Sequence, residues 1–172
     1  MTEWWQIVEC TGRTVLDIGG YDGGWGAKPA LEHGALSAVV VDNGEWKKYG
    51  WQEPGIEHPA IVYINEDFFE YDTPADIVIA GNVIYHLRDP IVGLKHLRKL
   101  TRESLVVKTS TVTPAEAGPD GWRWYENGEG HENMTVWARP TEEGLRRSLS
   151  RAGFRDVREV DQYGGFIVVC RP

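Results

Sequence analysis

The sequence predicts an α/β fold in which a seven-stranded, mostly parallel sheet carries helices on both faces. Short apolar runs alternate with helix-compatible segments as far as residue 108, which is typical of such a sheet. The runs are continuous rather than alternating, as in strands that are buried on both faces. The last two strands are joined by only four residues, 161–164, so they must pair antiparallel. We therefore expect a parallel sheet that ends in a C-terminal antiparallel hairpin.

The first half of the chain supplies three of the strands. A short helix is expected over 3–10, ending before Gly12, and the first strand covers 14–18. A crossover helix over 26–33 stops at Gly34, and a second strand covers 37–41. A short helix over 44–49 and a third strand over 60–64 complete this half.

The second half begins with a strand over 75–80 and a helix capped by Asp89, followed by a strand over 104–108. The alternation then stops. Residues 109–140 contain prolines, glycines and tryptophans without clear periodicity, which indicates a lid or substrate loop. Thr141 caps a helix that ends at Gly153, and the strands 154–160 and 165–170 follow.

Composition and charge limit the classes of function. The 172 residues, 41% hydrophobic and 26% charged, fit a single domain over 1–172. No run approaches the ~20 apolar residues of a membrane span, and the N-terminus does not resemble a signal peptide, so we expect a cytoplasmic protein with no membrane partner. The two cysteines lack metal-ligand spacing, so no metal is expected. The net charge of −8 disfavours nucleic acid as a partner without excluding a local basic groove.

The glycine-rich stretch after the first strand is the main candidate for a ligand site. Four glycines occupy positions between 19 and 24, where a strand turns into a helix. Glycine permits positive φ and lets a ligand lie against the main chain near free N–H groups. Alone, this turn is compatible with a dinucleotide, a phosphate, S-adenosylmethionine (SAM) or simply a tight packed turn.

Two carboxylates narrow the choice to an adenosine. Asp42 ends the second strand, where an acid can accept hydrogen bonds from both ribose hydroxyls; the alternative is a helix cap, because Asn43 and Gly44 follow. Asp67 follows the third strand and can accept from an adenine amino group while Phe68 packs on the ring. The alternative for this pair is a capping aspartate and a core phenylalanine.

The terminal hairpin separates SAM from a nicotinamide cofactor, because nicotinamide-binding Rossmann domains normally continue with parallel strands. Together with residues 15–23, 41–42, 67–68 and 139–154, it makes nearly the whole chain resemble the Rossmann-like class I SAM-dependent methyltransferases. Residues 81–90 resemble the G-V-L-Y-H-x-R-x-P segment of methyltransferases related to the tRNA wobble-uridine 5-oxyacetate enzyme.

The resemblance implies SAM as cofactor and assigns roles to particular residues. The cofactor-binding residues it implies are Asp17, Gly19, Gly20, Tyr21 and Gly23 toward the methionine end, Asp42 and Asn43 at the ribose, Asp67 and Phe68 at the adenine, and Asn82 near the sulfonium. Tyr21 departs from the family pattern, because a glycine is usual there. The tRNA enzymes also carry an additional domain, to which the resemblance does not extend, so ordinary SAM is expected rather than its carboxylated form.

Candidate catalytic and substrate residues follow the fourth and fifth strands. His86 is the candidate base, or else a histidine bonded to backbone; Tyr85 either orients the substrate or is a core aromatic residue. Lys108 either pairs with an anionic substrate or is solvated. In the loop, Trp122, Trp124 and His131 are candidate substrate contacts, although they can equally anchor the loop or be exposed.

These residues favour methyl transfer to an oxygen or nitrogen nucleophile of a small molecule. Two alternatives remain open: a methyltransferase of RNA or protein that acts with a partner, and a SAM-binding module without catalysis. The sequence leaves the oligomeric state undetermined.

Overall fold

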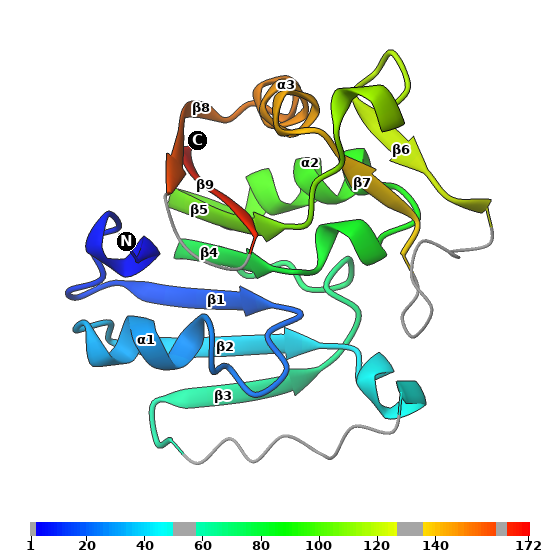
Figure 1. Ribbon diagram of the computed structural model, residues 1–172. Helices are drawn as coiled ribbons and strands as arrows, with labels where there is room; N and C mark the ends of the chain where they lie inside the picture. Colours follow the sequence, from blue (N-terminus) through cyan, green and yellow to red (C-terminus); the bar gives the residue numbers. More distant parts are fainter. Residues whose placement is uncertain (1–2, 50–57, 127–135, 161–164) are drawn as a thin grey trace.

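The computed structural model describes residues 3–49, 58–126, 136–160 and 165–172 (Figure 1). Seven strands form one sheet in the order β3-β2-β1-β4-β5-β9-β8, and a separate two-stranded ribbon joins β6 to β7. The strands of the sheet are β1 (Thr14–Ile18), β2 (Ser37–Asp42), β3 (Ile61–Asn65), β4 (Ala75–Gly81), β5 (Thr101–Thr109), β8 (Arg155–Val160) and β9 (Phe166–Arg171). The ribbon consists of β6 (Trp122–Trp124) and β7 (Ala138–Pro140).

Within the described residues, three α-helices and four 3-10 turns accompany these strands. The α-helices are α1 (Ala27–Glu32), α2 (Pro90–Leu100) and α3 (Glu142–Ala152); the turns are η1 (Trp4–Gln6), η2 (Glu45–Tyr49), η3 (Ile84–His86) and η4 (Pro114–Glu116). The first five strands are parallel, whereas β9 runs antiparallel to both β5 and β8. The predicted fold class, including the C-terminal hairpin, is confirmed.

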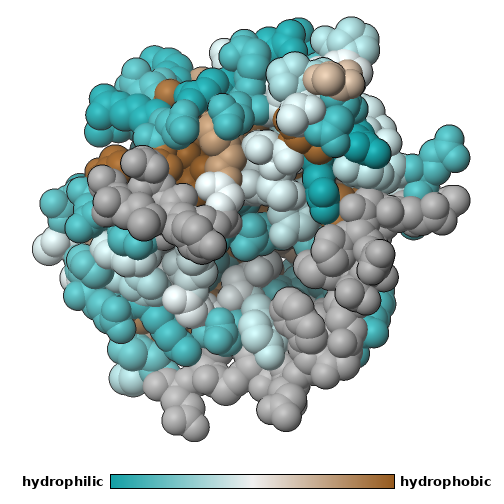
Figure 2. Space-filling model, viewed as in Figure 1, coloured by the Kyte–Doolittle hydropathy of each residue, from teal (hydrophilic) through white to brown (hydrophobic). Residues whose placement is uncertain are grey.

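Helices cover both faces of the sheet. On one face, α2 and α3 bury their leucines against Leu16, Val78 and Leu105. On the other face, α1 and the N-terminal turn pack against Val15 and Ile77. Burial on both faces explains why β1, β4 and β5 are almost continuously apolar in sequence. Most of the visible surface is hydrophilic, and hydrophobic side chains come to the surface near β8 and β9 (Figure 2).

The expected helix ends are formed by the expected residues. The Asp89 carboxylate accepts hydrogen bonds from the amides of Ile91 and Val92, both at 3.0 Å. The Thr141 hydroxyl accepts from Gly144 N at 2.9 Å, and α3 ends at Gly153 with φ +99°. These caps satisfy amides and carbonyls that the helices leave without partners.

Two expectations of secondary structure are corrected. The helix expected over 3–10 is a single 3-10 turn, closed by a reciprocal capping contact between Glu3 and Gln6, and one turn is too short to propagate as a helix. The loop expected over 109–140 contains η4 and the β6–β7 ribbon, and its residues 127–135 lie outside the described part of the chain. Within the described residues, no helix has the length and apolar character needed to cross a membrane.

Candidate active site

A cavity of about 1050 Å³ lies at the carboxyl ends of the parallel strands. This is the edge at which open α/β sheets bind their ligands. The loops after β1, β2, β3 and β4 all contribute to its lining. The predicted site residues in the lining are Asp17, Gly19, Gly20, Tyr21, Asp42, Asn43, Asp67, Phe68, Asn82, Tyr85 and His86. The fold therefore brings together eleven residues that the sequence analysis selected from four separate segments.

The glycine turn holds its main chain close to the neighbouring strands. Gly19 N donates to Val41 O at 2.8 Å, with Gly19 at φ +62°. A Cβ atom on Gly20 would lie 2.5 Å from the carboxyl carbon of Asp17. Gly23 does not line the cavity; it closes the turn by donating to Gly20 O at 2.7 Å. The absence of side chains at Gly19 and Gly20 thus leaves the backbone open toward the cavity.

Asp17 is buried directly beneath this turn. Its Oδ2 accepts a hydrogen bond from Ala27 N, the first residue of α1, at 2.9 Å. Burial raises the pKa of its carboxyl to about 7, and the Ala27 amide only partly offsets this effect. Asp17 therefore joins the strand end to the helix start and changes charge near neutral pH.

Asp42 connects the first two loops of the cavity. Its Oδ2 accepts from Tyr21 N at 3.1 Å, and its Oδ1 accepts from Gly44 N at 2.8 Å. Asn43 accepts from Glu45 N at 3.0 Å and so caps η2. The capping interpretation and the ligand interpretation of Asp42 are compatible, because a carboxylate oxygen can accept more than one hydrogen bond.

The segment after β3 offers one exposed ring and one buried ring. Asp67 accepts from Phe69 N at 3.0 Å. Phe68 belongs to the hydrophobic core, whereas Phe69 is 39% exposed, and their ring centroids are 4.2 Å apart. Phe68 therefore supports the wall of the cavity, and Phe69 presents the more accessible ring.

Two non-glycine residues of the cavity have left-handed backbone conformations. Tyr21 has φ +48° and Asn82 has φ +60°. Asn82 N donates to Lys108 O at 2.9 Å, which ties the end of β4 to that of β5. Non-glycine residues in this region cost energy and concentrate at functional sites. Their positions agree with the predicted location of the site.

The opposite wall of the cavity is formed by η3 and the strand leading into β7. Tyr85 and His86 lie with ring centroids 4.4 Å apart. Trp137 N donates to Tyr85 O at 2.9 Å, which brings the Trp137 side chain into the lining. Burial raises the pKa of the Tyr85 phenol, and the nearby Arg139 guanidinium partly opposes this rise. Tyr85 is therefore held as a neutral hydrogen-bond donor at ordinary pH.

Among the predicted substrate residues, Trp122 does not have the role of a substrate contact. Trp122 is only 2% exposed, and its Nε1 donates to Ser148 Oγ on α3 at 3.0 Å, so it anchors the β6–β7 ribbon instead of contacting a substrate. Trp124 is 48% exposed and donates to Asp120 Oδ2, away from the residues that line the cavity. The remaining candidate of this loop, His131, lies outside the described residues.

Lys108 takes a position that the sequence did not indicate. Its Nζ lies 5.1 Å from the centroid of the Trp25 ring, and Lys108 is not part of the cavity lining. Trp25 lines the cavity and packs so closely on Gly81 that a Cβ atom there would lie 2.5 Å from Trp25 Cε3. Trp25, Phe69 and Arg88 also line the cavity, although the sequence did not predict a role for them there. No spacing rule identifies these three residues, because tertiary packing places them at the cavity.

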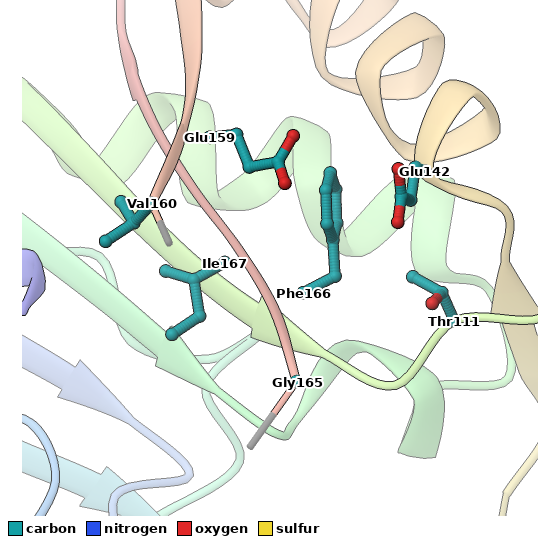
Figure 3. Close-up of a pocket in the computed structure, with 7 residues that line it drawn as sticks. All are labelled: Thr111, Glu142, Glu159, Val160, Gly165, Phe166 and Ile167. Atoms are coloured by element: carbon teal, nitrogen blue, oxygen red, sulfur yellow. The ribbon is translucent and has the colours of Figure 1, made fainter. Parts of the chain in front are cut away.

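A smaller cavity of about 290 Å³ lies beside the hairpin (Figure 3). In Figure 3 the ring of Phe166 stands between Glu142 and Glu159. Glu159 is paired with Arg146 at 2.8 Å. The described residues that line this cavity include no histidine, cysteine or lysine, so the larger cavity is the candidate active site.

Relatives of known function cover nearly all of this chain. A tRNA U34 carboxymethyltransferase of Idiomarina loihiensis is 29% identical over 93% of the chain and 54% of its own length. The enzyme of the same name from Pseudomonas aeruginosa is 33% identical over 93% of the chain and 53% of its own length. The chain thus spans about half the length of the curated relatives it matches.

These relatives contradict one expectation. A small-molecule substrate was expected and nucleic acid was considered an improbable partner, because the chain carries a net charge of −8. The relatives are named for a reaction on tRNA. Net charge failed as a guide because it sums over the whole surface and does not report where individual charges lie.

Solved structures of SAM-dependent methyltransferases share the fold. One from Mesorhizobium loti has a TM-score of 0.67 at 18% identity, covering 97% of this chain and 94% of that one. The N-terminal domain of EvdMO1, solved with S-adenosylhomocysteine (SAH), has a TM-score of 0.70 at 17% identity. The match covers 98% of this chain and 79% of that one. The predicted cofactor class is confirmed. The family described as "Methyltransferase domain" matches residues 8–159, and the chain therefore belongs to this methyltransferase family.

Proposed function

We propose that this chain transfers a methyl group from SAM to an oxygen or nitrogen atom of an RNA nucleotide. The main support for the proposal is that one cavity is lined by the glycine turn, Asp42 and Asp67 and also by Tyr85 and His86. The RNA substrate class is supported by the tRNA-acting relatives, which match this chain along 93% of its length.

The residues present fit SAM. The turn at Gly19 and Gly20 lines the cavity and leaves no room for a Cβ atom, since a Cβ on Gly19 would lie 2.8 Å from Val83 Cγ2. The cavity of about 1050 Å³ is at the upper end of the roughly 300–1,000 Å³ of small-molecule sites, so it has room for a cofactor and an incoming base. Asp42 would hold the ribose hydroxyls, and Asp67 with the Phe69 ring would hold the adenine.

Asp17 lies near the predicted methionine end. When bound, SAM supplies an electrophilic methyl group on a sulfonium, together with a positively charged amino group. A carboxylate beside a cation has a lower pKa, so bound SAM would favour the ionised form of Asp17 and lower its pKa from about 7.

Tyr85 and His86 would act on the acceptor. The raised pKa of Tyr85 suits it to donate a hydrogen bond that orients the nucleotide. His86 is the candidate base that removes the proton of the nucleophile. Alignment of the reactants can supply ~7–11 kcal/mol of the barrier reduction, and a positioned base typically adds ~10²–10⁴-fold in rate.

The test offers labelled SAM to wild-type protein with equal amounts of a tRNA pool and a small-metabolite pool. We expect the label in the RNA fraction. Asp42→Asn keeps the size of the side chain but removes its charge, and it should weaken SAM binding in calorimetry by roughly tenfold or more. Label confined to the metabolite fraction would refute the RNA acceptor, and unchanged SAM affinity of the variant would refute the ribose role. A parallel reaction with carboxylated SAM identifies the transferred group.

A further inference from the structure

Three arginines on the side of Tyr85 and Trp137 each stack on an aromatic ring, and one of them, Arg88, lines the cavity. The Arg88 Cζ lies 4.8 Å from the centroid of Trp137. The Cζ atoms of Arg123 and Arg139 lie 5.1 Å and 5.9 Å from the centroid of Tyr125. We call the three arginines together with Trp137 and Tyr125 the arginine rim. It is a concentration of positive charge in a chain whose net charge is −8.

Backbone hydrogen bonds fix the rim next to the predicted catalytic residues. Tyr125 N donates to Trp137 O, and Trp137 N donates to Tyr85 O, both at 2.9 Å. Arg88 and Trp137 themselves line the cavity, and the charge of Arg139 acts on the Tyr85 phenol. A ligand bound to the rim is therefore held at the entrance on the side of Tyr85 and His86.

Within the described residues, two of the rim arginines lack an acidic partner. Arg123 is paired with Glu116 at 3.0 Å. Arg88 and Arg139, in contrast, form no ion pair and no side-chain hydrogen bond with any residue in the described part of the chain, and Arg139 Nε is buried without a partner. The carboxylate of Asp89, adjacent to Arg88, is already engaged in capping α2.

A guanidinium stacked on a ring keeps its planar N–H edge available, and that edge matches the oxygens of a phosphate. Half-buried aromatic rings next to such a group, here Trp137 and Tyr125, also offer stacking surfaces to unpaired bases. A base reaches a cavity of this kind only from a single-stranded segment or after leaving its stack. The rim thus matches the chemistry of a single-stranded RNA loop.

We propose that Arg88 and Arg139 bind the phosphates that flank the target nucleotide of a single-stranded RNA loop, while Trp137 and Tyr125 support them and direct the base into the cavity. This inference rests on the proposed function and specifies the surface through which the substrate is recognised. It assigns the recognition of RNA to side chains that the cofactor does not use.

The test measures binding of a fluorescently labelled RNA stem-loop by anisotropy at several salt concentrations. We expect Arg88→Gln and Arg139→Gln each to weaken binding by roughly tenfold. Each should also reduce the slope of log affinity against log salt by ~0.7, the value for one phosphate contact on a single strand. Arg151→Gln removes an exposed arginine from the far end of α3 and should leave affinity and slope unchanged. SAM affinity, measured by calorimetry, should stay within about twofold in all variants.

Wild-type affinity and slope in the Arg88→Gln/Arg139→Gln double variant would overturn the inference. A parallel loss of SAM affinity would also overturn it, because the arginines would then be structural. An equal loss of affinity for a mononucleotide and for the stem-loop would show a site for a small phosphorylated ligand instead. Methylation of RNA by the wild type separates the two proposals: if RNA is methylated while the rim variants bind normally, only the rim fails.

Discussion

The two walls of the cavity are built in different ways. On the cofactor wall, carboxylates hold the main chain: Asp17 binds the start of α1, and Asp42 binds the amides of Tyr21 and Gly44. On the acceptor wall, side chains of η3 and of the ribbon region provide aromatic rings and guanidiniums. The first wall is fixed by short-range contacts around strand ends, whereas the second depends on how a distant ribbon docks. This difference predicts that mutations can damage one wall and spare the other.

The largest effect on stability should come from the anchor of the acceptor wall. Trp122→Ala removes a fully buried indole and its hydrogen bond to Ser148, so the free energy of unfolding should fall by about 3–5 kcal/mol in urea titrations. The control Trp124→Ala, at an exposed position of the same strand, should change it by no more than about 0.5 kcal/mol. Similar losses for both variants would contradict the assignment of Trp122 as the anchor.

On the cofactor wall, we expect substitution of Gly20 to have the largest effect. A Cβ atom there would lie 2.5 Å from the buried carboxyl group of Asp17, so Gly20→Ala should lower the free energy of unfolding by about 1–3 kcal/mol and weaken SAM binding at least tenfold. In the control Gly24→Ala, the new Cβ meets only the end of the Asp22 side chain, so the SAM affinity measured by calorimetry should change little. Equal SAM affinities for the two variants would contradict a special role of Gly20 in SAM binding.

The pH dependence of the free energy of unfolding reports on the ionisation of Asp17. Its pKa is raised from 3.8 in the unfolded chain to about 7 in the folded protein, so folding favours the protonated carboxyl. The stability that Asp17 contributes is fully present below about pH 3.8 and is lost as pH rises through about 7. Asp17→Asn cannot titrate, so the unfolding free energy of the wild type should decline relative to this variant between these limits. A pH-independent difference between the two proteins would show that Asp17 keeps an ordinary pKa.

The smallest effect is expected at Tyr21. Its φ of +48° is unfavourable for any residue with a Cβ, so Tyr21→Gly should raise the free energy of unfolding by up to about 1 kcal/mol. Thermal unfolding provides the measurement. A loss of stability would mean that contacts of the tyrosine ring outweigh the backbone strain.

The same difference between the walls explains what could be predicted from the sequence. Asp42 ends β2, and Asp67 lies two residues beyond the end of β3. Parallel strand ends meet at one edge, so their convergence could be predicted without knowledge of side-chain packing. Trp137 reaches the cavity because its backbone N–H is hydrogen-bonded to Tyr85 O, across a long separation in sequence. The sequence left Trp122 open between a substrate contact and a loop anchor, because its burial depends on Ser148 of α3, which lies far from it in the chain.

The central claim is that the two walls together methylate RNA, and product analysis tests it most directly. Wild-type protein is incubated with SAM and a tRNA pool, and the RNA is then digested to nucleosides and examined by mass spectrometry. We predict a methylated nucleoside that forms with wild-type protein, decreases strongly with Asp42→Asn and depends on Arg88 and Arg139. An unmodified nucleoside profile from a wild-type protein that binds SAM would contradict the claim.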